Sequence, residues 1–499
     1  MASIKPHVPV TPFQKRAGMV LLFLLVSRLL AMWLMPLNDS TEARYGEIAR
    51  IMLETGDWIT PMQSVGVPFW AKPPLSTWTS ASSMWLFGIN AFAARLPSLL
   101  LSLGTLWLVW DVAKQRSGSH AALISVLVLA GSLFFFLDAG TVMTDPALLF
   151  CTTLSLIAFW RAVVNPQKTW GHVFFAGLGL GLLAKGPIAL VLVGMPIFVW
   201  VLMHHRWRAI WRSLPWITGG LLMVLIAVPW YVLAEIKTPG FIHYFIIGEH
   251  FHRFLDPGWG GDKYGFAHKA HYGMIWVYAV LGFLPWSVLG VIGLTRHVRK
   301  WPLLFKDNDG WVAYLLACIF MPIIFFTCSG NIIYPYVFPI LPFLALLFSD
   351  VLIRMDGKES TAKTETRLLS LASISGVIFL MVTALFVFKP EWVAKSQYRV
   401  VAAYQKAASS KESRLVYWAP KTDFSAQFYS AGRAMATLDA TELGHLLSNA
   451  VDNYVVIRSN QYTTIPDDLK AHLMPMITIK ALKDTLTLYR SDPYSYFNG

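Results

Sequence analysis

The stretch AGMVLLFLLVSRLLAMWLMPL (17–37), followed at once by NDSTEARYGEIARIMLETGDWITP (38–61), decides the fold class. Its first part is apolar for about twenty residues, which is the length that a helix needs to cross a bilayer. No small-x-small cleavage site follows it, so the stretch predicts a retained membrane span and not a signal peptide. In the second part, Tyr45, Ile48 and Met52 recur at helical spacing and Gly56 stands where a C-cap is expected. This pattern predicts an amphipathic helix over residues 41–55, just outside the membrane.

The composition excludes most soluble classes. Of the 499 residues, 56% are hydrophobic and 14% are charged, with 41 Lys and Arg against 28 Asp and Glu. A soluble nucleic-acid-binding protein could be that basic, but it would not carry 21 Trp and 32 Phe, and a disordered chain is excluded by the same apolar content. The three cysteines lie in apolar runs and have neither disulfide nor zinc-site spacing. The composition therefore indicates a polytopic membrane protein.

Hydropathy predicts about eleven spans. They lie near residues 17–37, 93–113, 120–138, 144–164, 171–184, 187–203, 213–234, 273–295, 311–328, 332–351 and 367–388. With the N-terminus inside, alternate connections hold about twice as many Lys and Arg as the opposite side, as the positive-inside rule requires. An odd number of spans then places the C-terminus outside.

The chain is predicted to have two parts. Residues 1–390 form an α-helical transmembrane domain with long outer loops at 38–92 and 235–272, and loops of that length are usually functional. Residues 391–499 alternate β-rich segments such as RLVYWA and NYVVIRS with helical ones, which predicts a small extracytoplasmic α/β domain. No phosphate-binding loop or dinucleotide fingerprint stands in a suitable context, so nucleotide-driven chemistry has no support.

Three carboxylates on the outer side have two interpretations each. Asp39 and Glu42 lie three residues apart beside Arg44 and Tyr45, which fits either a helix-capping box or a catalytic pair. Asp145 precedes a proline at the outer start of the fourth predicted span, where it either caps the helix or marks a substrate path.

Three basic residues on the outer side break the positive-inside pattern. Lys72, Lys185 and Arg253 either extend toward the membrane interface or bind phosphate beside the carboxylates. The second outer loop also holds His243, His250, His252, His268 and His271. Their spacing matches no strong zinc signature, so no metal ligand is assigned and a divalent metal stays an open alternative.

Seven segments in one order carry a resemblance to a known family. They are DSTEARYGEIARIMLETGDWITP, FWAKPPLSTW, TDPALLF, LLAKGPIAL, GEHFHRF, FLPW and YPYVFPILP. Over about residues 17–350 the chain resembles the bacterial branch of the protein O-mannosyltransferase superfamily, and within it the 4-amino-4-deoxy-L-arabinose lipid A transferases. The resemblance implies a GT-C glycosyltransferase fold, a polyprenyl-phosphate sugar donor and transfer on the outer membrane face.

The chain departs from the family pattern at three places. The D-E-x-R-Y segment reads Thr41-Glu42-Ala43-Arg44-Tyr45, so Glu42 or the displaced Asp39 must supply the carboxylate. The E-K-P turn keeps Lys72 but has Ala71 in place of the glutamate, which puts in doubt a metal site built on it. Ile332 stands where a lysine is common, while Tyr336 is kept.

The resemblance implies a role for each site residue. Lys72, Arg253 and Lys185 would stabilise the phosphate leaving group, and Asp39 or Glu42 would accept a proton from the acceptor. Asp145 would orient the acceptor or hold a cation, and Arg44, Tyr45 and Tyr336 would contact the donor. Glu249 and His250 would hold these side chains in position without contacting the substrate themselves.

The function expected from the sequence is an inverting membrane glycosyltransferase that modifies lipid A or another envelope glycan. It would lie in the bacterial inner membrane, with its active site and C-terminal domain in the periplasm. Its partners would be the lipid-linked donor, the acceptor and membrane lipids, with no nucleic acid. Protein O-glycosyl transfer is the alternative acceptor chemistry. A transporter or flippase is less well supported, because the chain shows no repeat symmetry and few mid-span charges such as Arg28.

Overall fold

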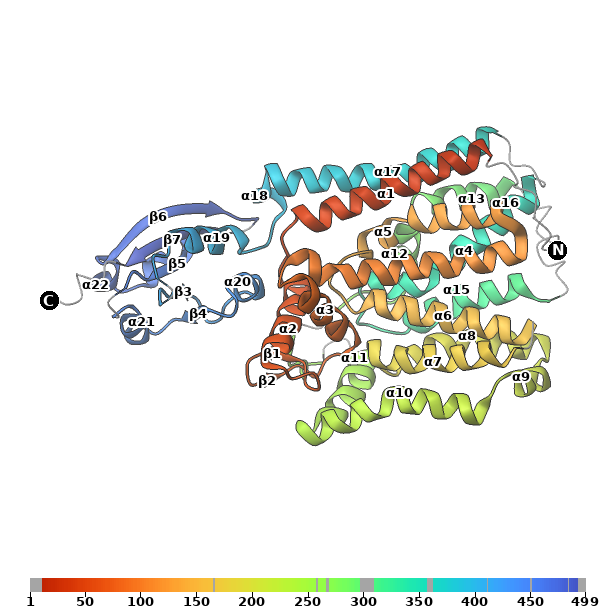
Figure 1. The fold of residues 1–499 in the computed structure, drawn as a ribbon, viewed down its shortest axis with the longest axis horizontal. Helices are drawn as coiled ribbons and strands as arrows, with labels where there is room; N and C mark the ends of the chain where they lie inside the picture. Colours follow the sequence, from red (N-terminus) through yellow and green to blue (C-terminus); the bar gives the residue numbers. More distant parts are fainter. Residues whose placement is uncertain are drawn as a thin grey trace, which may run out of the picture.

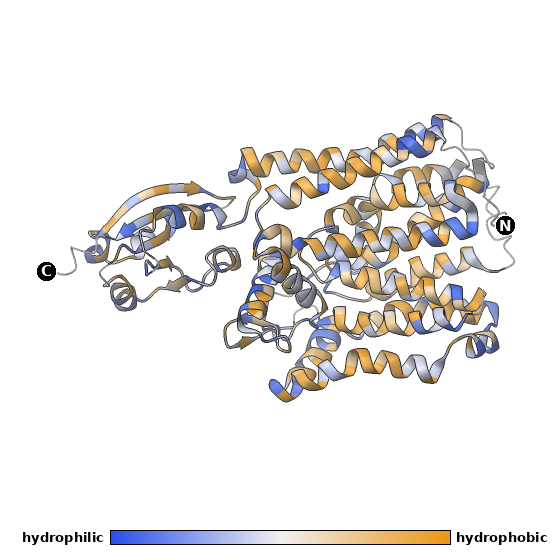
Figure 2. Ribbon diagram, viewed as in Figure 1, coloured by the Kyte–Doolittle hydropathy of each residue, from blue (hydrophilic) through white to orange (hydrophobic). Residues whose placement is uncertain are grey.

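The computed structural model describes residues 11–164, 167–256, 259–265, 269–296, 309–356, 362–410, 412–448, 451–482 and 484–491. Within them, a bundle of long helices is followed by a small domain built on a β-sheet, which projects from one end of the bundle (Figure 1). The helices of the bundle are apolar along most of their length, and hydrophilic residues gather toward their ends (Figure 2). This distribution is that of a multi-pass membrane protein.

The bundle contains the helices of the first 393 residues. They are α1 (Pro12–Leu34), α2 (Thr41–Thr55), α3 (Leu75–Phe87), α4 (Ala91–Ala130), α5 (Leu133–Asp138), α6 (Asp145–Val164), α7 (Lys168–Lys185), α8 (Ile188–His204), α9 (Trp207–Ser213), α10 (Trp216–Lys237), η1 (His243–His252), α11 (Arg253–Leu255), α12 (Met274–Gly282), α13 (Trp286–Arg296), α15 (Trp311–Thr327), η3 (Tyr334–Ile340), α16 (Leu341–Asp356), α17 (Ala362–Phe388) and α18 (Pro390–Val393). A short hairpin of β1 (Met62–Ser64) and β2 (Val67–Pro68) lies between α2 and α3.

The structure does not confirm the expected count of eleven spans. In the described residues, six helices are long and apolar enough to cross a membrane, or seven if the bent pair α12–α13 is one broken span. The regions expected to cross at 187–203 and 311–328 are helical, but α8 and α15 have only 17 residues each. The expected spans 93–113 and 120–138 are joined in α4, with a kink at Gly118, and the second ends at Ala130. The α12–α13 pair bends by 100° at the FLPW segment.

The predicted amphipathic helix of the first outer loop is confirmed. It is α2, Thr41–Thr55, and Gly56 ends it in the left-handed conformation with φ of 68°. Its apolar side chains, among them Ile48 and Met52, are buried against α3 and the loop that follows the hairpin. The helix therefore lies over the end of the bundle from which the C-terminal domain projects, instead of crossing the bundle (Figure 1).

The C-terminal part forms the expected α/β unit. Its elements are α19 (Tyr398–Ala407), β3 (Leu415–Trp418), α20 (Phe424–Tyr429), β4 (Ala434–Thr437), α21 (Ala440–Leu447), β5 (Tyr454–Arg458), η4 (Ser459–Thr464), α22 (Asp467–Lys470), β6 (Leu473–Lys480) and β7 (Thr485–Ser491). The strand order is β4-β3-β5-β7-β6, parallel among β4, β3 and β5, and antiparallel from β5 to β7 and β6.

The central strands β3 and β5 of this domain are buried on both faces. In β3, Leu415 and Tyr417 pack with the side chains of α19, whereas Val416 and Trp418 pack with those of α21. Successive side chains of a strand point to opposite faces, so a strand covered on both sides is apolar at every position. This explains the continuous apolar run LVYW.

Candidate functional site

A cavity of about 560 Å³ lies where the outer loops meet the ends of the bundle helices. Its lining comes from α2, the turn at Phe69–Lys72, the start of α6, the α7–α8 junction, η1, α11, the end of α15 and η3. Segments that are far apart in the sequence thus contribute to one space. The cavity is where a substrate would contact the charged residues of both long loops.

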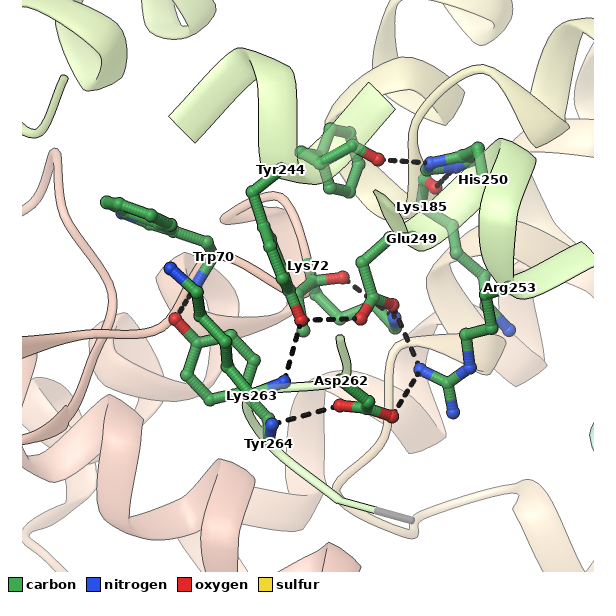
Figure 3. Close-up of polar contacts among 12 residues, drawn as sticks. Trp70, Lys72, Lys185, Tyr244, Glu249, His250, Arg253, Asp262, Lys263 and Tyr264 are labelled. Carbon is green, nitrogen blue, oxygen red and sulfur yellow. Dashed lines mark hydrogen bonds and ion pairs between the residues drawn. The ribbon is translucent and has the colours of Figure 1, made fainter. Parts of the chain in front are cut away.

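Glu249 is the centre of the polar wall shown in Figure 3. Its Oε2 atom lies 3.1 Å from Lys72 Nζ and 3.0 Å from Arg253 Nη1, and its Oε1 atom accepts a hydrogen bond of 3.1 Å from the Tyr244 hydroxyl. Arg253 Nη1 is also 3.5 Å from Asp262 Oδ2. Burial alone would raise the pKa of Glu249, but Lys72 and Arg253 outweigh it and hold that pKa below its usual range. Two cations therefore converge on one carboxylate oxygen.

A second ion pair faces the same cavity. Lys185 Nζ lies 2.6 Å from Asp145 Oδ1, and both side chains are almost completely buried. The Lys185 ammonium also lies 4.9 Å from the centre of the Tyr336 ring. A buried carboxylate at the membrane boundary is costly unless it is paired, and this pairing is what Lys185 provides.

The α7–α8 turn holds Lys185 in place. Gly186 follows it with φ of 85°, and a Cβ atom there would lie 2.5 Å from Phe245 Cζ. Only glycine fits this close contact in the left-handed region. His250 joins the two segments, since its Nδ1 atom is 2.8 Å from the Phe245 carbonyl oxygen and its Nε2 atom 3.3 Å from that of Lys185.

Helix α2 brings Arg44 and Tyr45 to the cavity. Arg44 Nη1 donates a hydrogen bond of 2.5 Å to the Tyr264 carbonyl, and the guanidinium lies 5.6 Å from the centre of the Phe69 ring. Tyr45 packs edge-on against the same ring. The two predicted donor contacts are thus held by the Phe69 ring of the first outer loop and the Tyr264 backbone of the second.

Asp39 and Glu42 lie elsewhere. Neither is among the residues that line the cavity within the described part of the chain. Glu42 forms a two-pronged pair with Arg95, with Nε–Oε1 and Nη2–Oε2 distances of 2.7 Å. Burial would raise the pKa of Glu42, but Arg95 outweighs it and lowers that pKa. Asp39 accepts hydrogen bonds from the backbone and hydroxyl of Ser425 in the C-terminal domain.

The capping interpretation of the same pair is wrong for Asp39. The N-cap of α2 is Ser40, and its side chain makes no capping hydrogen bond. Asp39 instead contacts α20, and Glu42 keeps one local bond, from the Asn38 N–H at 3.3 Å. Glu42 therefore links α2 to α4, and Asp39, which directly precedes Ser40 and α2, links this segment to the C-terminal domain.

The predicted phosphate-contact residues do come together. Lys72, Arg44, Tyr45, Lys185, Arg253 and Tyr336 all line the cavity, as do Asp145, Glu249 and His250. Lys72 and Lys185 point to carboxylates inside the protein and do not extend toward the membrane interface. Which of these residues act on a substrate stays a prediction.

Several lining residues were not singled out from the sequence. Asp262, Tyr264 and Asn331 belong to this group, and Tyr244 stands directly behind Glu249. Asn331 donates hydrogen bonds to the carbonyls of Arg253 (2.6 Å) and Asp256 (2.8 Å). The one available signal for Asp262 was its place in the second long loop, since nothing local distinguishes it.

The histidines of the second loop do not gather at the cavity. Of those within the described residues, only His250 lines it, whereas His268 lies outside the described residues. In the described ranges no three His, Cys, Asp or Glu side chains come together in a way that could hold a metal ion. The carboxylates that line the cavity are already paired with Lys or Arg, so this donor set does not fit a metal.

One wall of the cavity is apolar. Ile188, Val191 and Leu192 line it along one face of α8, and Phe325 and Phe326 line it from the end of α15. The polar wall and the apolar wall together suit an amphiphilic molecule with an anionic head.

The chain is similar in sequence to known glycosyltransferases. Residues 18–245 match the family described as dolichyl-phosphate-mannose-protein mannosyltransferase. The undecaprenyl phosphate-alpha-4-amino-4-deoxy-L-arabinose arabinosyl transferase of Edwardsiella ictaluri is 27% identical over 326 residues, which is 64% of this chain and 56% of that protein. The protein of the same name from Erwinia tasmaniensis is 29% identical over 363 residues, 70% of this chain and 61% of that protein. The match thus spans less than two thirds of the length of either relative.

Solved structures extend the likeness to the whole chain. The crystal structure of ArnT from Cupriavidus metallidurans bound to undecaprenyl phosphate superimposes with a TM-score of 0.73 at 18% identity, covering 95% of this chain and 98% of that one. The archaeal oligosaccharyltransferase AglB from Archaeoglobus fulgidus superimposes with a TM-score of 0.51 at 11% identity, covering 97% of this chain and 75% of that one. These superpositions show a shared fold, and the resemblance predicted from the seven motifs is confirmed.

Proposed function

Because the chain has the GT-C glycosyltransferase fold and carries a protein mannosyltransferase family domain over residues 18–245, we propose that it is an integral membrane glycosyltransferase. It moves a sugar from a polyprenyl-phosphate donor to lipid A or another cell-envelope glycan. The observation that carries this proposal is the cavity with two buried clusters of basic and acidic groups on one wall and apolar side chains on the other. The names of the relatives, arabinosyl transferases that use undecaprenyl phosphate, support the donor class.

The phosphate of the donor is the leaving group, and Lys72 and Arg253 would receive it. Both contact Glu249 Oε2, so a phosphate oxygen placed beside that carboxylate meets two preplaced cations. Charge that develops on the leaving oxygen is stabilised by groups that need not move to reach it. Lys185, Arg44, Tyr45 and Tyr336 complete the contacts to the sugar and the phosphate.

We assign the proton-accepting role to Asp145. The expected bases Asp39 and Glu42 lie outside the cavity lining, whereas Asp145 lines it. The acceptor hydroxyl attacks the anomeric carbon, the carbon–oxygen bond to the phosphate breaks, and the hydroxyl proton passes to Asp145. One direct displacement inverts the anomeric centre. Asp39 and Glu42 act as positioning residues for α2 in this scheme.

The lipid tail of the donor would lie along the apolar wall. Ile188, Val191 and Leu192 form an apolar strip along the cavity, and the lipid tail would follow this strip into the bilayer. Burying isoprenoid carbons contributes roughly 0.8 kcal/mol per CH₂. The wall therefore supports a lipid-linked donor over a soluble sugar nucleotide.

The proposed location is the bacterial inner membrane, with the cavity and the C-terminal domain in the periplasm. The support is the excess of Lys and Arg at the opposite bundle end, which the positive-inside rule assigns to the cytoplasm.

Protein O-glycosylation is the second candidate, and the description of the matching family favours it. Deleting the gene and measuring the masses of lipid A, other glycolipids and exported proteins separates the two. Loss of one sugar mass from lipid A or a glycolipid supports the primary proposal, and loss from proteins supports the alternative. Unchanged masses in all three fractions, under conditions where the protein is expressed, would overturn both.

A further inference from the structure

A second cavity lies at the other end of the bundle. It has a volume of about 440 Å³ and is lined by residues of α4, α6 and α16. Helix α6 begins with Asp145 at the donor cavity, and Arg161 in its last turn lines the second cavity. At 1.5 Å per residue the two positions are separated by about 24 Å along the helix. The second cavity is therefore distinct from the site already described.

The charged residues that line this cavity are all arginines. They are Arg116, Arg161 and Arg354, joined by the polar residues Gln115 and Ser117, and no Asp or Glu is among the described lining residues. Each arginine is paired with an acid that is not part of the lining. Arg161 Nη2 lies 2.6 Å from Asp111, Arg116 Nη1 2.7 Å from Asp309, and Arg354 Nη2 4.0 Å from Asp350. The acids hold the guanidinium groups in place, and the described lining itself carries guanidinium groups and no carboxylate.

Arg161 is the most informative member of the group. Arg161 is 8% exposed, and its Nε atom is buried without a hydrogen-bond partner in the described residues. The guanidinium also lies 4.4 Å from the centre of the Trp170 ring. A buried N–H of a charged group that lacks an acceptor is costly. An acceptor that enters the cavity would remove this cost.

We propose that the cavity among α4, α6 and α16 is a binding site for a phosphate-bearing anion. Arginine forks match the oxygens of phosphate better than any other side chain does. The volume is much larger than the roughly 30 Å³ that one water occupies, so a single bridging water does not account for it. Basic pockets between membrane helices on the cytoplasmic side lie level with lipid headgroups. The ligand is an anionic phospholipid headgroup or a soluble phosphate.

The test uses the purified full-length protein in detergent. Its thermal unfolding is measured against increasing dioleoyl phosphatidylglycerol, zwitterionic dioleoyl phosphatidylcholine, and inorganic phosphate. The midpoint shift gives an apparent Kd for each probe. The main variant combines Arg161→Gln with Asp111→Asn, which removes the pair without leaving a buried charge. Arg354→Gln is the second variant. Arg208→Gln, at an exposed arginine of α9 outside the lining, is its charge-matched control, and the double variant keeps the net charge of the wild type.

We expect one anionic probe to stabilise the wild type and the Arg208→Gln control alike. Its apparent Kd rises about tenfold in each cavity variant, as loss of one charged hydrogen bond predicts. A response to phosphatidylglycerol but not to inorganic phosphate identifies the lipid headgroup, and the reverse identifies a soluble phosphate. The proposal is overturned if neither anionic probe stabilises the wild type, or if the cavity variants respond as the wild type does.

Discussion

At the scale of single residues, the proposed role of Lys72 is to stabilise the donor phosphate. Lys72→Ala should leave the protein folded, because Arg253 still pairs with Glu249. Sugar transfer should fall by about 10²–10³-fold, as when one preplaced donor to a developing anion is lost. The measurement is the rate of transfer by the purified variant, together with its unfolding temperature.

Lys237→Ala provides the matched control for Lys72→Ala. Lys237 is also an outer lysine paired with a carboxylate, Asp57 at 2.7 Å, but it lies outside the cavity lining. Transfer by this variant should equal that of the wild type. Equal losses in both variants would contradict a specific role for Lys72.

Asp39 should make the stability of the protein depend on pH. Burial raises the pKa of Asp39 to about 6, with Asp423 adding to the rise and Ser425 and Lys395 opposing it. A carboxyl whose pKa is higher in the folded state binds its proton more tightly there. Its contribution to stability is therefore complete below the unfolded pKa, near 4, and is lost as the pH rises through about 6.

The variant Asp39→Asn imitates the protonated form and tests this dependence. Between pH 4 and 7 the unfolding temperature of the wild type should fall relative to that of Asp39→Asn. Parallel curves for the two proteins would show that the pKa of Asp39 is not raised in the folded state.

The residue scale also shows how far sequence reasoning reached. Lys72, Lys185 and Arg253 were identified because they break a charge rule that applies to whole loops, and all three line the cavity. The choice between Asp39, Glu42 and Asp145 could not be made in this way. It depends on partners such as Arg95 and Ser425, which are distant in the sequence.

At the scale of elements, the α7–α8 turn should depend on glycine. Gly186→Ala introduces a Cβ at positive φ and 2.5 Å from Phe245, so it should destabilise the protein by more than about 1 kcal/mol and displace Lys185. Gly194→Ala in α8 is the control, since no atom beyond its chain neighbours and its own helix backbone lies within 4 Å of the added carbon. That variant should be neutral or slightly stabilised. Thermal unfolding of both variants is the measurement, and equal stabilities would contradict the packing described for the turn.

Elements with a strong local signal were predicted well, whereas the sharp bend between α12 and α13 was not. The helix over 41–55 was predicted to the residue from its periodicity and Gly56. The break in α4 at Gly118 falls in the predicted connection between the spans 93–113 and 120–138, whereas the 100° bend between α12 and α13 was not predicted. A hydropathy window averages over such breaks, because it measures composition and not backbone direction.

At the scale of the whole molecule, the two ends of the bundle should face opposite sides of the membrane. Met435, in β4 of the C-terminal domain, and Arg208, in α9, are both exposed. In a Cys328→Ser background, Met435→Cys should react with a membrane-impermeant maleimide in intact spheroplasts, whereas Arg208→Cys should react only after lysis. The reverse labelling would place the cavity in the cytoplasm.

The most direct test of the central claim is transfer by the purified protein. Wild-type protein, undecaprenyl-phosphate-linked 4-amino-4-deoxy-L-arabinose and lipid A are incubated, and both lipid products are analysed by mass spectrometry. We predict that lipid A gains one sugar as undecaprenyl phosphate is released, and that Asp145→Asn, folded by its thermal unfolding, transfers at least about 100-fold more slowly. A transfer rate of Asp145→Asn equal to that of the wild type would contradict the role of Asp145. The account as a whole would be contradicted if the wild type transferred no sugar to lipid A or to any envelope glycan or protein offered.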